Sequence, residues 1–507
     1  MDAHTSSDYE LDWLKRWNQY APRSLAITDG DTALNLTYAQ LYQQSCAGAT
    51  YLKENFGIKA GDRILHFSTN EMSSFVLFFA LARLGATLVP INYRLTGREV
   101  SYIITNAEPT LLVYEESFLG LLKEIENEIP IKSKDWLALV GKNSFQSATI
   151  QTKKLFTEFH SSSQSTALII YTSGTTGFPK GAMISHQMLF WNSINTTLRL
   201  NIAESDSAVI FLPLFHTGGW NVLSTPFLHR GAHIILTKKF EAEQILTLSE
   251  QHSATLLFGV PTTMAMMSRT EKFKTVDLSS LRYAICGGEP MPLEQIDIWQ
   301  KKNVPIRQGY GLTEFGPNVF SLNEEDSIRK MGSIGFPNFY VDVCVVDENK
   351  KYLGANEIGE LWLKGPMSMT GYWKNPKATE ETFFEGWLQT GDLVYFDDEN
   401  YFYVVGRKKD MYKSGGENVY PAEIEQVIQQ LPWILEVAVI GIKDEQWGEV
   451  GHAYIVAKND LFNEVELRAH CSQNLAKFKN PKFFTAMKEL PKGDSGKILK
   501  RKLTEQA

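Results

Sequence analysis

One ten-residue stretch constrains the fold more than any other part of the chain: residues 171–180 read Y-T-S-G-T-T-G-F-P-K. The apolar run at 167–170 before it is typical of a buried strand that ends in a loop. Gly174 and Gly177 let the backbone turn closely, so that successive N–H groups and hydroxyls can converge on one anion, and Lys180 adds a positive charge. The pattern indicates a loop that binds a chain of phosphates. A surface turn rich in Ser, Thr and Gly is the alternative.

This loop differs from a P-loop in the residues at its C-terminal end. A P-loop needs Gly-Lys-Ser/Thr at the start of a helix, whereas here Phe178 and Pro179 come before Lys180. Residues 181–184, Gly-Ala-Met-Ile, predict a second short strand, and Ser185 is suited to cap a helix after it. The sequence therefore predicts a loop that connects two strands.

The order of predicted elements gives the fold class. Residues 63–68, 70–84 and 86–90 read as a strand, a helix and a strand, and a crossover of this length indicates parallel strands covered by helices. The alternation returns between residues 208 and 286. We therefore expect an α/β protein whose large, multi-layer N-terminal domain has parallel-containing sheets covered by helices.

Two changes in the sequence pattern indicate the domain organisation. From about residue 332 to 405 the chain reads as short strands and turns, which predicts a β-rich subdomain. Residues 406–410, G-R-K-K-D, cannot bury much surface and are a candidate linker. We predict a large domain over residues 1–408 and a small, mobile α+β domain over residues 409–507, because 507 residues are too many for one core.

Composition excludes several classes of protein. The balance of 50 basic against 58 acidic side chains argues against broad nucleic-acid binding. Four scattered cysteines without zinc-site spacing indicate a reducing compartment and no structural metal. The N-terminus lacks a secretory signal, and no apolar run near it approaches the roughly 20 residues of a membrane span. We expect a cytoplasmic protein without a transmembrane segment; peripheral membrane association and a homodimer stay open.

Further motifs lie after the loop along the chain. In order, they are YTSGTTGFPKG at 171–181, LPLFHTGG at 212–219, GGEP at 287–290, QGYGLTE at 308–314, TGD at 390–392, GRKKDMYKSGGENVYPAEIE at 406–425 and PKGDSGK at 491–497. Together they make the sequence resemble the adenylate-forming superfamily, the acyl-CoA synthetases and AMP-dependent ligases that share a fold with luciferases and peptide-synthetase adenylation domains.

The resemblance implies a two-step reaction. A carboxylate attacks the α-phosphate of ATP to give an acyl adenylate and pyrophosphate, and the thiol of coenzyme A then displaces AMP. The first step joins two anions, so catalysis must consist largely of charge neutralisation and positioning. ATP and coenzyme A are thus the expected co-substrates, with Mg²⁺ as the metal.

The resemblance also implies which residues contact ATP. For the β- and γ-phosphates they are Thr172, Ser173, Gly174, Thr175, Thr176, Gly177 and Lys180. Glu314 is expected to coordinate Mg²⁺, with Thr313 close to the α-phosphate. The expected adenine contacts are Gly288, Glu289, Pro290, Gly309, Tyr310 and Gly311, with Tyr310 as the stacking ring, and the expected ribose contacts are Asp392 and Arg407. For Tyr310 and Asp392 taken alone, a core aromatic and a turn residue are the alternatives.

The C-terminal part carries the remaining implied roles. Lys497 matches the lysine that stabilises the adenylation transition state, although a solvated tail lysine is the alternative. Lys409 matches the hinge about which the small domain rotates between the two half-reactions. Gly415, Gly416 and Glu417 would belong to the face that meets the thiol.

The acid pocket is implied by two segments. Its expected residues are His216, Thr217, Gly218, Gly219, Trp220, Asn221, Val260, Thr262 and Met264. Amino-acid-activating relatives begin the first segment with an aspartate, which is absent here. Acetate-specific relatives place tryptophan where Gly311 stands, so glycine is expected to leave the pocket open. We therefore expect a medium-chain or long-chain fatty acid or an aromatic acid. A structural role for His216 is the alternative.

Other functions share part of this pattern. A standalone adenylating enzyme that loads a carrier-protein thiol in trans would share every ATP motif, although no carrier domain follows Lys497 here. Light-emitting oxidation has no support in the sequence. A scaffold protein would not need the phosphate, ribose and lysine positions together.

Overall fold

The computed structural model describes residues 9–172, 179–289, 291–458, 461–492 and 498–505. It has two compact units, the first formed by Met1–Asp342 with Lys364–Leu388, the second by Val343–Leu363 with Gln389–Ala507. The division predicted between residues 408 and 409 stays a prediction.

The first unit contains a seven-stranded sheet in the order β18-β8-β7-β4-β3-β5-β6. Its strands are β18 (Gly371–Tyr372), β8 (Lys180–Ser185), β7 (Thr166–Thr172), β4 (Thr87–Pro90), β3 (Arg63–Phe67), β5 (Leu111–Tyr114) and β6 (Trp136–Ala138). The pairs from β7 to β6 are parallel, whereas β7–β8 and β8–β18 are antiparallel. The predicted parallel strands are therefore confirmed.

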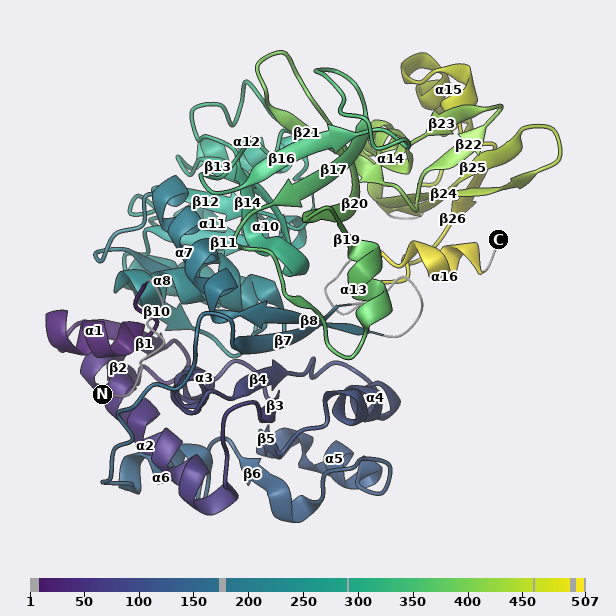
Figure 1. The fold of residues 1–507 in the computed structure, drawn as a ribbon. Helices are drawn as coiled ribbons and strands as arrows, with labels where there is room; N and C mark the ends of the chain where they lie inside the picture. The colour runs from purple at the N-terminus through teal and green to yellow at the C-terminus, as the bar shows by residue number, and fades with distance from the viewer. Residues whose placement is uncertain (1–8, 173–178, 290, 459–460, 493–497, 506–507) are drawn as a thin grey trace. The chain divides into compact units, whose positions relative to one another are not determined.

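Helices cover both faces of this sheet because neighbouring residues of its strands point to opposite faces. In β3, Ile64 packs in one hydrophobic cluster and Leu65 in another. Figure 1 shows α2 (Tyr38–Phe56) and α6 (Phe145–Gln151) on one side of these strands, and α4 (Gly97–Ala107) and α5 (Leu119–Ile125) on the other. Thr37 caps α2 by accepting a hydrogen bond from Gln40 N–H at 3.2 Å.

The second sheet of this unit has nine strands in the order β15-β14-β13-β12-β11-β9-β10-β1-β2. They are β15 (Phe336–Pro337), β14 (Gly316–Ser321), β13 (Ile306–Leu312), β12 (Tyr283–Cys286), β11 (Leu256–Gly259), β9 (Ser207–Ile210), β10 (His233–Leu236), β1 (Leu25–Asp29) and β2 (Asn35–Thr37). The run from β13 to β1 is parallel. The segments that come after β9, β11, β12 and β13 therefore leave the sheet at the same edge.

The other helices of the first unit connect and cover these strands. They are α1 (Trp13–Tyr20), α3 (Met72–Leu84), α7 (His186–Leu200), α8 (Ser224–Arg230), α9 (Ala242–Gln251), α10 (Pro261–Ser268), α11 (Glu271–Thr275), α12 (Leu293–Lys301) and α13 (Pro376–Thr382). Short turns of helix occur at η1 (Glu116–Phe118), η2 (Ser133–Asp135), η3 (Gly218–Val222), which is a π-helix, and η4 (Thr313–Phe315).

Two five-stranded sheets account for most of the second unit. One has the order β16-β17-β20-β19 with β21 beside β20, and the other has the order β23-β22-β25-β24 with β26 beside β25. The strands of the first are β16 (Asp342–Val346), β17 (Gly359–Lys364), β20 (Trp387–Phe396), β19 (Phe383–Phe384) and β21 (Phe402–Arg407). Of these, β19 and the start of β20 belong to the first unit. The predicted β-rich segment is thus confirmed as strands.

The C-terminal sheet carries the last helices of the chain. Its strands are β23 (Glu417–Val419), β22 (Tyr412–Ser414), β25 (Gly448–Ala457), β24 (Ile434–Asp444) and β26 (Phe483–Ala486), and the helices are α14 (Pro421–Ile428), α15 (Glu464–Asn474), η6 (Lys477–Lys479) and α16 (Lys500–Thr504). Both α14 and α16 pack on β24, and Lys500 pairs with Glu425 at 2.7 Å.

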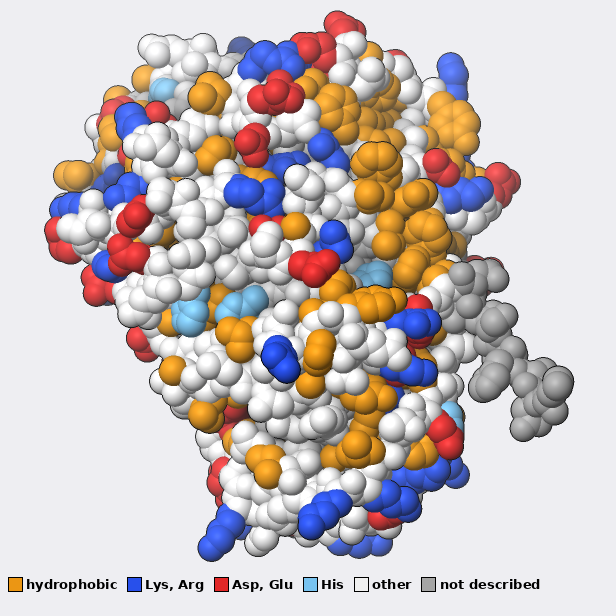
Figure 2. All heavy atoms as spheres, turned by 90° about the vertical axis from the view of Figure 1, so that its left-hand side faces the viewer, with side chains coloured by type: hydrophobic (Ala, Val, Ile, Leu, Met, Phe, Trp, Pro, Cys, Tyr) orange, Lys and Arg blue, Asp and Glu red, His pale blue; other side chains and the backbone are white. Residues whose placement is uncertain are grey.

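The surface carries both signs of charge. Figure 2 shows Lys and Arg side chains interspersed with Asp and Glu, while hydrophobic side chains gather towards one side of the view. Among the helices that the structure describes, none combines the length and the apolar character needed to cross a membrane.

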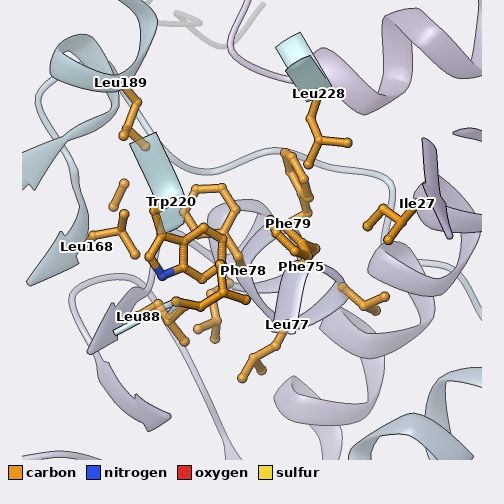
Figure 3. Packing of buried hydrophobic residues seen from close by; sticks show 14 of the residues in the cluster. Ile27, Phe75, Leu77, Phe78, Phe79, Leu88, Leu168, Leu189, Trp220 and Leu228 are labelled. Carbon is orange, nitrogen blue, oxygen red and sulfur yellow. The ribbon is translucent and has the colours of Figure 1, made fainter. Parts of the chain in front are cut away.

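The helix α3 is the centre of the first unit. All of its residues are buried, including Arg83, whose guanidinium pairs with the buried Asp12 at 2.9 Å. A helix that is apolar on every side has to be covered on every side, and one hydrophobic cluster joins α3 to strands of both sheets. In Figure 3, Phe75 and Phe78 of α3 surround the indole of Trp220.

Candidate active site

The phosphate-loop motif lies in a β-hairpin. Strands β7 and β8 pair antiparallel up to Thr172 opposite Lys180, and Ser185 then caps α7 by accepting a hydrogen bond from Met188 N–H at 3.1 Å. The two strands predicted on either side of the loop, and the helix cap, are therefore confirmed. Ser173, Gly174, Thr175, Thr176 and Gly177 lie outside the described residues.

Glu314 lies beside this hairpin, in the turn η4 that directly follows β13. Its Oε1 accepts a hydrogen bond from the Tyr372 hydroxyl at 2.9 Å and a long one from Thr172 Oγ1 at 3.4 Å. The Lys180 ammonium lies 5.3 Å from the centroid of the Tyr372 ring. Burial, together with the nearby Glu314 carboxylate, raises the pKa of Tyr372 well above its usual value. The phenol therefore keeps its proton and acts as a hydrogen-bond donor.

Tyr372 is a residue that sequence reasoning missed. It belongs to the two-residue strand β18, in which Gly371 and Tyr372 pair with Met183 and Ala182 of β8. The next residue, Trp373, donates from its backbone N–H to Gly181 O at 2.7 Å. A two-residue strand has no periodicity to detect, so only long-range pairing could have placed Tyr372 here.

The predicted adenine residues occupy two neighbouring loops. Gly288, with φ +88°, follows β12, and Gly309 lies in β13 beside it. A methyl group on Gly287 would lie 3.4 Å from Gly309 O, so the two backbones are nearly in contact. The Tyr310 ring meets Phe320 edge-on at 5.8 Å. Glu289 is exposed, and Pro290 lies outside the described residues.

The first acid-pocket segment begins at His216, which is exposed. The backbone N–H of Gly218 donates to His216 Nδ1 at 3.0 Å, so the neutral imidazole carries its proton on Nε2. Just before it, the buried Asn70 donates to Leu212 O at 3.1 Å and accepts from Leu214 N–H at 2.9 Å. Asn70, which no motif contains, therefore fixes the path of this segment.

The second acid-pocket segment follows β11. Its Val260 lies 3.7 Å from where a methyl group on Gly288 would stand. Phe258 of β11 is within 3.7 Å of the corresponding position on Gly218 and 3.6 Å of that on Gly287. Phe258 was not singled out from the sequence, yet it lies between the predicted acid and adenine segments. The sheet edge therefore brings these two sets of residues together.

Several predicted pocket residues are buried in the surrounding structure. Trp220 is fully buried in the hydrophobic cluster around α3 (Figure 3). Asn221 donates to Thr217 Oγ1 at 3.1 Å and accepts from Thr225 at 3.2 Å, all three side chains being buried. Met264 is also buried, whereas Thr262 is exposed. For Trp220, Thr217 and Asn221, these contacts favour support of the pocket wall over direct contact with an acid.

Two glycines are required by close backbone approach. A Cβ on Gly219 would lie 2.3 Å from Pro213 O, and one on Gly311 would lie 2.2 Å from Pro317 O. A tryptophan at 311 would therefore need a different path for the β13–β14 hairpin. Close backbone contact, rather than free space, thus explains the glycine at 311, and the expected open pocket gains no support at this position.

The predicted ribose residues lie in the second unit. Asp392 and Arg407 face each other across β20 and β21 and form an ion pair of 3.0 Å. The buried Glu360 of β17 accepts from Gly391 N–H at 3.2 Å and pairs with Lys408 at 2.9 Å. Glu360, another residue missing from the motifs, thereby holds the neighbours of both ribose residues in place.

The predicted hinge and thiol face lie further along the same unit. Lys409 lies in a turn closed by the hydrogen bond from Asp410 N–H to Arg407 O at 3.0 Å. Gly415 and Gly416 have φ of +61° and +88°, a conformation that glycine adopts without strain. The half-exposed Trp447 lies against Gly415, since a Cβ there would be 3.1 Å from its ring, and Glu417 is exposed beside it. Lys497 lies outside the described residues.

The donor groups suit Mg²⁺ better than zinc or another firmly bound metal. The described residues contain no group of three or more His, Cys, Asp or Glu side chains that could hold a metal ion. Mg²⁺ in phosphate-transfer sites needs only one or two carboxylates, because substrate phosphates and water supply the other oxygens. Glu314, a single carboxylate beside the hairpin, fits that requirement.

Family models match most of the chain. The model of the AMP-binding enzyme matches residues 14–373, and that of the AMP-binding enzyme C-terminal domain matches residues 423–497. The chain therefore belongs to the AMP-binding enzyme family, the adenylate-forming superfamily that its motifs indicated.

Several proteins similar to this chain are named as acid–CoA ligases. A feruloyl-CoA synthase of Amycolatopsis sp is 34% identical over 489 residues, which cover 96% of this chain and 97% of that protein. The long-chain-fatty-acid–CoA ligase FadD13 of Mycobacterium tuberculosis is 34% identical over 499 residues, 98% of each chain. The ATP-bound structure of MatB from Rhodopseudomonas palustris is 31% identical, with a TM-score of 0.90 over 98% of this chain and 99% of that one. The predicted α/β fold is thereby confirmed, and the names support an acid–CoA ligase without fixing the acid.

Proposed function

We propose that this protein joins a carboxylic acid to coenzyme A through an acyl adenylate. One observation carries the proposal: the hairpin of Thr172 and Lys180 lies beside Glu314, at the sheet edge where the predicted acid and adenine segments also meet. Such a cluster offers a cation and a carboxylate next to the two predicted substrate segments. Adenylation needs these groups because it brings two anions together.

In the first half-reaction, a carboxylate oxygen of the acid forms a bond to the α-phosphorus of ATP, and the bond from that phosphorus to pyrophosphate breaks. The Lys180 ammonium would neutralise the departing pyrophosphate, and Thr313 would lie close to the α-phosphate. His216 would donate from Nε2 to the acid carboxylate, which the hydrogen bond at Nδ1 favours. Lys497 would supply charge at the reacting oxygens.

Glu314 would hold Mg²⁺, which when bound would neutralise phosphate charge and keep the phosphates in one conformation. The nucleoside would be recognised by the residues that the resemblance assigns to it. Asp392 would accept hydrogen bonds from the ribose hydroxyls, with Arg407 as the second contact, and Tyr310 would stack on the adenine. Glu360 would keep the Asp392–Arg407 pair in register.

In the second half-reaction, the thiol sulfur of coenzyme A attacks the acyl carbon, and AMP leaves with the bridging oxygen. Rotation about Lys409 would bring Gly415, Gly416 and Glu417 to the thiol. The glycines would let the pantetheine arm approach the backbone closely, and Trp447 would flank it.

A medium-chain or long-chain fatty acid and an aromatic acid both remain in the proposal. The relatives named above include one enzyme of each kind, a feruloyl-CoA synthase and a long-chain-fatty-acid–CoA ligase. Phe258 and Val260, which lie next to the predicted acid and adenine segments, are apolar and would suit either class.

The experiment that tests the proposal measures pyrophosphate release with a panel of acids, with and without coenzyme A. We expect a fatty or aromatic acid to give pyrophosphate and AMP, with stoichiometric acyl-CoA when coenzyme A is present. A different result would identify an enzyme that loads a carrier in trans: adenylation that gives no thioester with coenzyme A, but does give one with a carrier protein bearing phosphopantetheine.

A further inference from the structure

Tyr372 contacts two charged residues of the candidate site, Lys180 at the start of β8 and Glu314 in η4. Its hydroxyl donates to Glu314 Oε1 at 2.9 Å, and the Lys180 ammonium lies 5.3 Å from the centre of its ring. The ion pairs of the described residues include no pair between Lys180 and Glu314, although both side chains reach the same tyrosine. Tyr372 is therefore a neutral side chain that contacts both charged groups.

The hydroxyl also determines which carboxylate oxygen is occupied. The side-chain hydrogen bonds that Glu314 accepts from Tyr372 and from Thr172 both reach Oε1. Within the described part of the chain, Oε2 receives no side-chain contact of this kind. A carboxylate held through one oxygen presents the other in a fixed direction, as is common for metal-binding carboxylates supported by neighbouring donors.

The backbone around Tyr372 is firmly placed. Its N–H donates to Thr379 Oγ1 at 2.9 Å, and its strand pairs with β8, which begins at Lys180. Trp373 adds a hydrogen bond from its indole N–H to Asn106 O at 3.0 Å. The position of the phenol therefore depends on strand pairing that also fixes the end of the phosphate loop.

We propose that Tyr372 is the positioning residue that fixes Glu314 for Mg²⁺. The proposal rests on the function proposed above, because it takes Glu314 as the metal-binding carboxylate. Tyr372 itself would touch neither metal nor nucleotide. Its effect should therefore appear in the coupling between Mg²⁺ and ATP binding, and not in ATP binding alone.

The test compares ATP affinity by calorimetry in EDTA and in saturating Mg²⁺, which requires no turnover. For Tyr372→Phe, we expect about a tenfold smaller gain in ATP affinity from Mg²⁺ than in the wild type, with the affinity in EDTA unchanged. Tyr102→Phe is the matched control, because it removes a half-buried hydroxyl that contacts Pro179 O at 3.4 Å in the same region. Tyr102→Phe should keep the full gain in ATP affinity from Mg²⁺.

Each other outcome has a distinct meaning. A Mg²⁺ effect in Tyr372→Phe equal to that of the wild type overturns the role of Tyr372 while leaving the proposed function intact. If Tyr372→Phe weakens ATP binding equally in EDTA and in Mg²⁺, the residue is merely structural, and the proposed role of Tyr372 is also overturned. A wild type that does not bind ATP, or whose binding ignores Mg²⁺, contradicts the proposed function itself.

A double-mutant cycle guards against a folding defect in the single variant. Glu314→Gln should lose the Mg²⁺ effect, and adding Tyr372→Phe should change nothing further, because the two residues act through one contact. A lower ATP affinity in the double variant than in Glu314→Gln, with melting temperatures matched to the single variants, would refute the link between them.

Discussion

At the scale of the residue, the hydrogen bond to His216 Nδ1 gives a specific chemical expectation. A backbone N–H donor leaves Nδ1 unprotonated, so the neutral ring is a donor at Nε2. An acid carboxylate is an acceptor, and the two therefore match. Gly219 supports this geometry, because any side chain there would collide with Pro213 O in the same loop.

Lys497 should act in only one half-reaction. We predict that Lys497→Ala lowers the rate of acyl-AMP formation by about 100-fold or more, because a positioned charge on the reacting oxygens is lost. The transfer of preformed acyl-AMP to coenzyme A should survive, and rapid-quench assays of the two steps would measure this. Lys492→Ala is the control, since Lys492 pairs with Glu436 and has no assigned role. Equal loss in both steps would exclude the assignment.

Sequence motifs predicted residues of the candidate site but not the residues that support them. Lys180 and Glu314 lie in motifs with recognisable residue types. Tyr372, Asn70 and Glu360 do not, because their roles arise from contacts between segments far apart in the chain. Trp220 is the converse case, a predicted pocket residue that packs in the core.

At the scale of the element, the ends of parallel strands organise the first unit. β9, β11, β12 and β13 all release their loops at one edge, and each loop carries a predicted site segment. Regular alternation of strands and helices allowed this sheet to be predicted. Two-residue strands such as β18 and the π-helix η3 could not be predicted, because they lack a repeating pattern.

The hinge prediction belongs to the same scale. The residue before Lys409 is held in place. Lys408 pairs with the buried Glu360 and donates a hydrogen bond from its backbone N–H to Gly391 O at 2.9 Å. If the small domain rotates as predicted, we expect the change of backbone conformation at or beyond Lys409. We predict that Lys409→Pro spares adenylation and slows thioester formation at least about tenfold, because proline fixes φ.

Single-turnover assays of the two half-reactions would measure the effect of Lys409→Pro. Asp398→Pro is the matched control, because Asp398 is the second residue of the turn closed by Asn400 N–H to Asp397 O, where proline is favoured. It should leave both steps unchanged. A Lys409→Pro variant with normal thioester formation would rule out the hinge.

At the scale of the whole molecule, the sequence predicted a large α/β part and then a smaller C-terminal part, and the family models match in that order. The sequence could not reveal that Val343–Leu363 packs with the C-terminal unit, since this depends on contacts across the chain. It also left the acid open. Specificity depends on the shape of a pocket assembled from several loops, which local patterns do not encode.

The oxygen atoms of the acid allow adenylation itself to be tested. If a carboxylate oxygen attacks the α-phosphorus, an acid labelled with heavy oxygen at both carboxylate positions must transfer one labelled oxygen to each AMP and keep the other in the thioester. Mass spectrometry of AMP, pyrophosphate and acyl-CoA after a single turnover would measure this. We predict one heavy oxygen in every AMP and none in pyrophosphate. Unlabelled AMP, or ADP as the product, would contradict a route through an acyl adenylate.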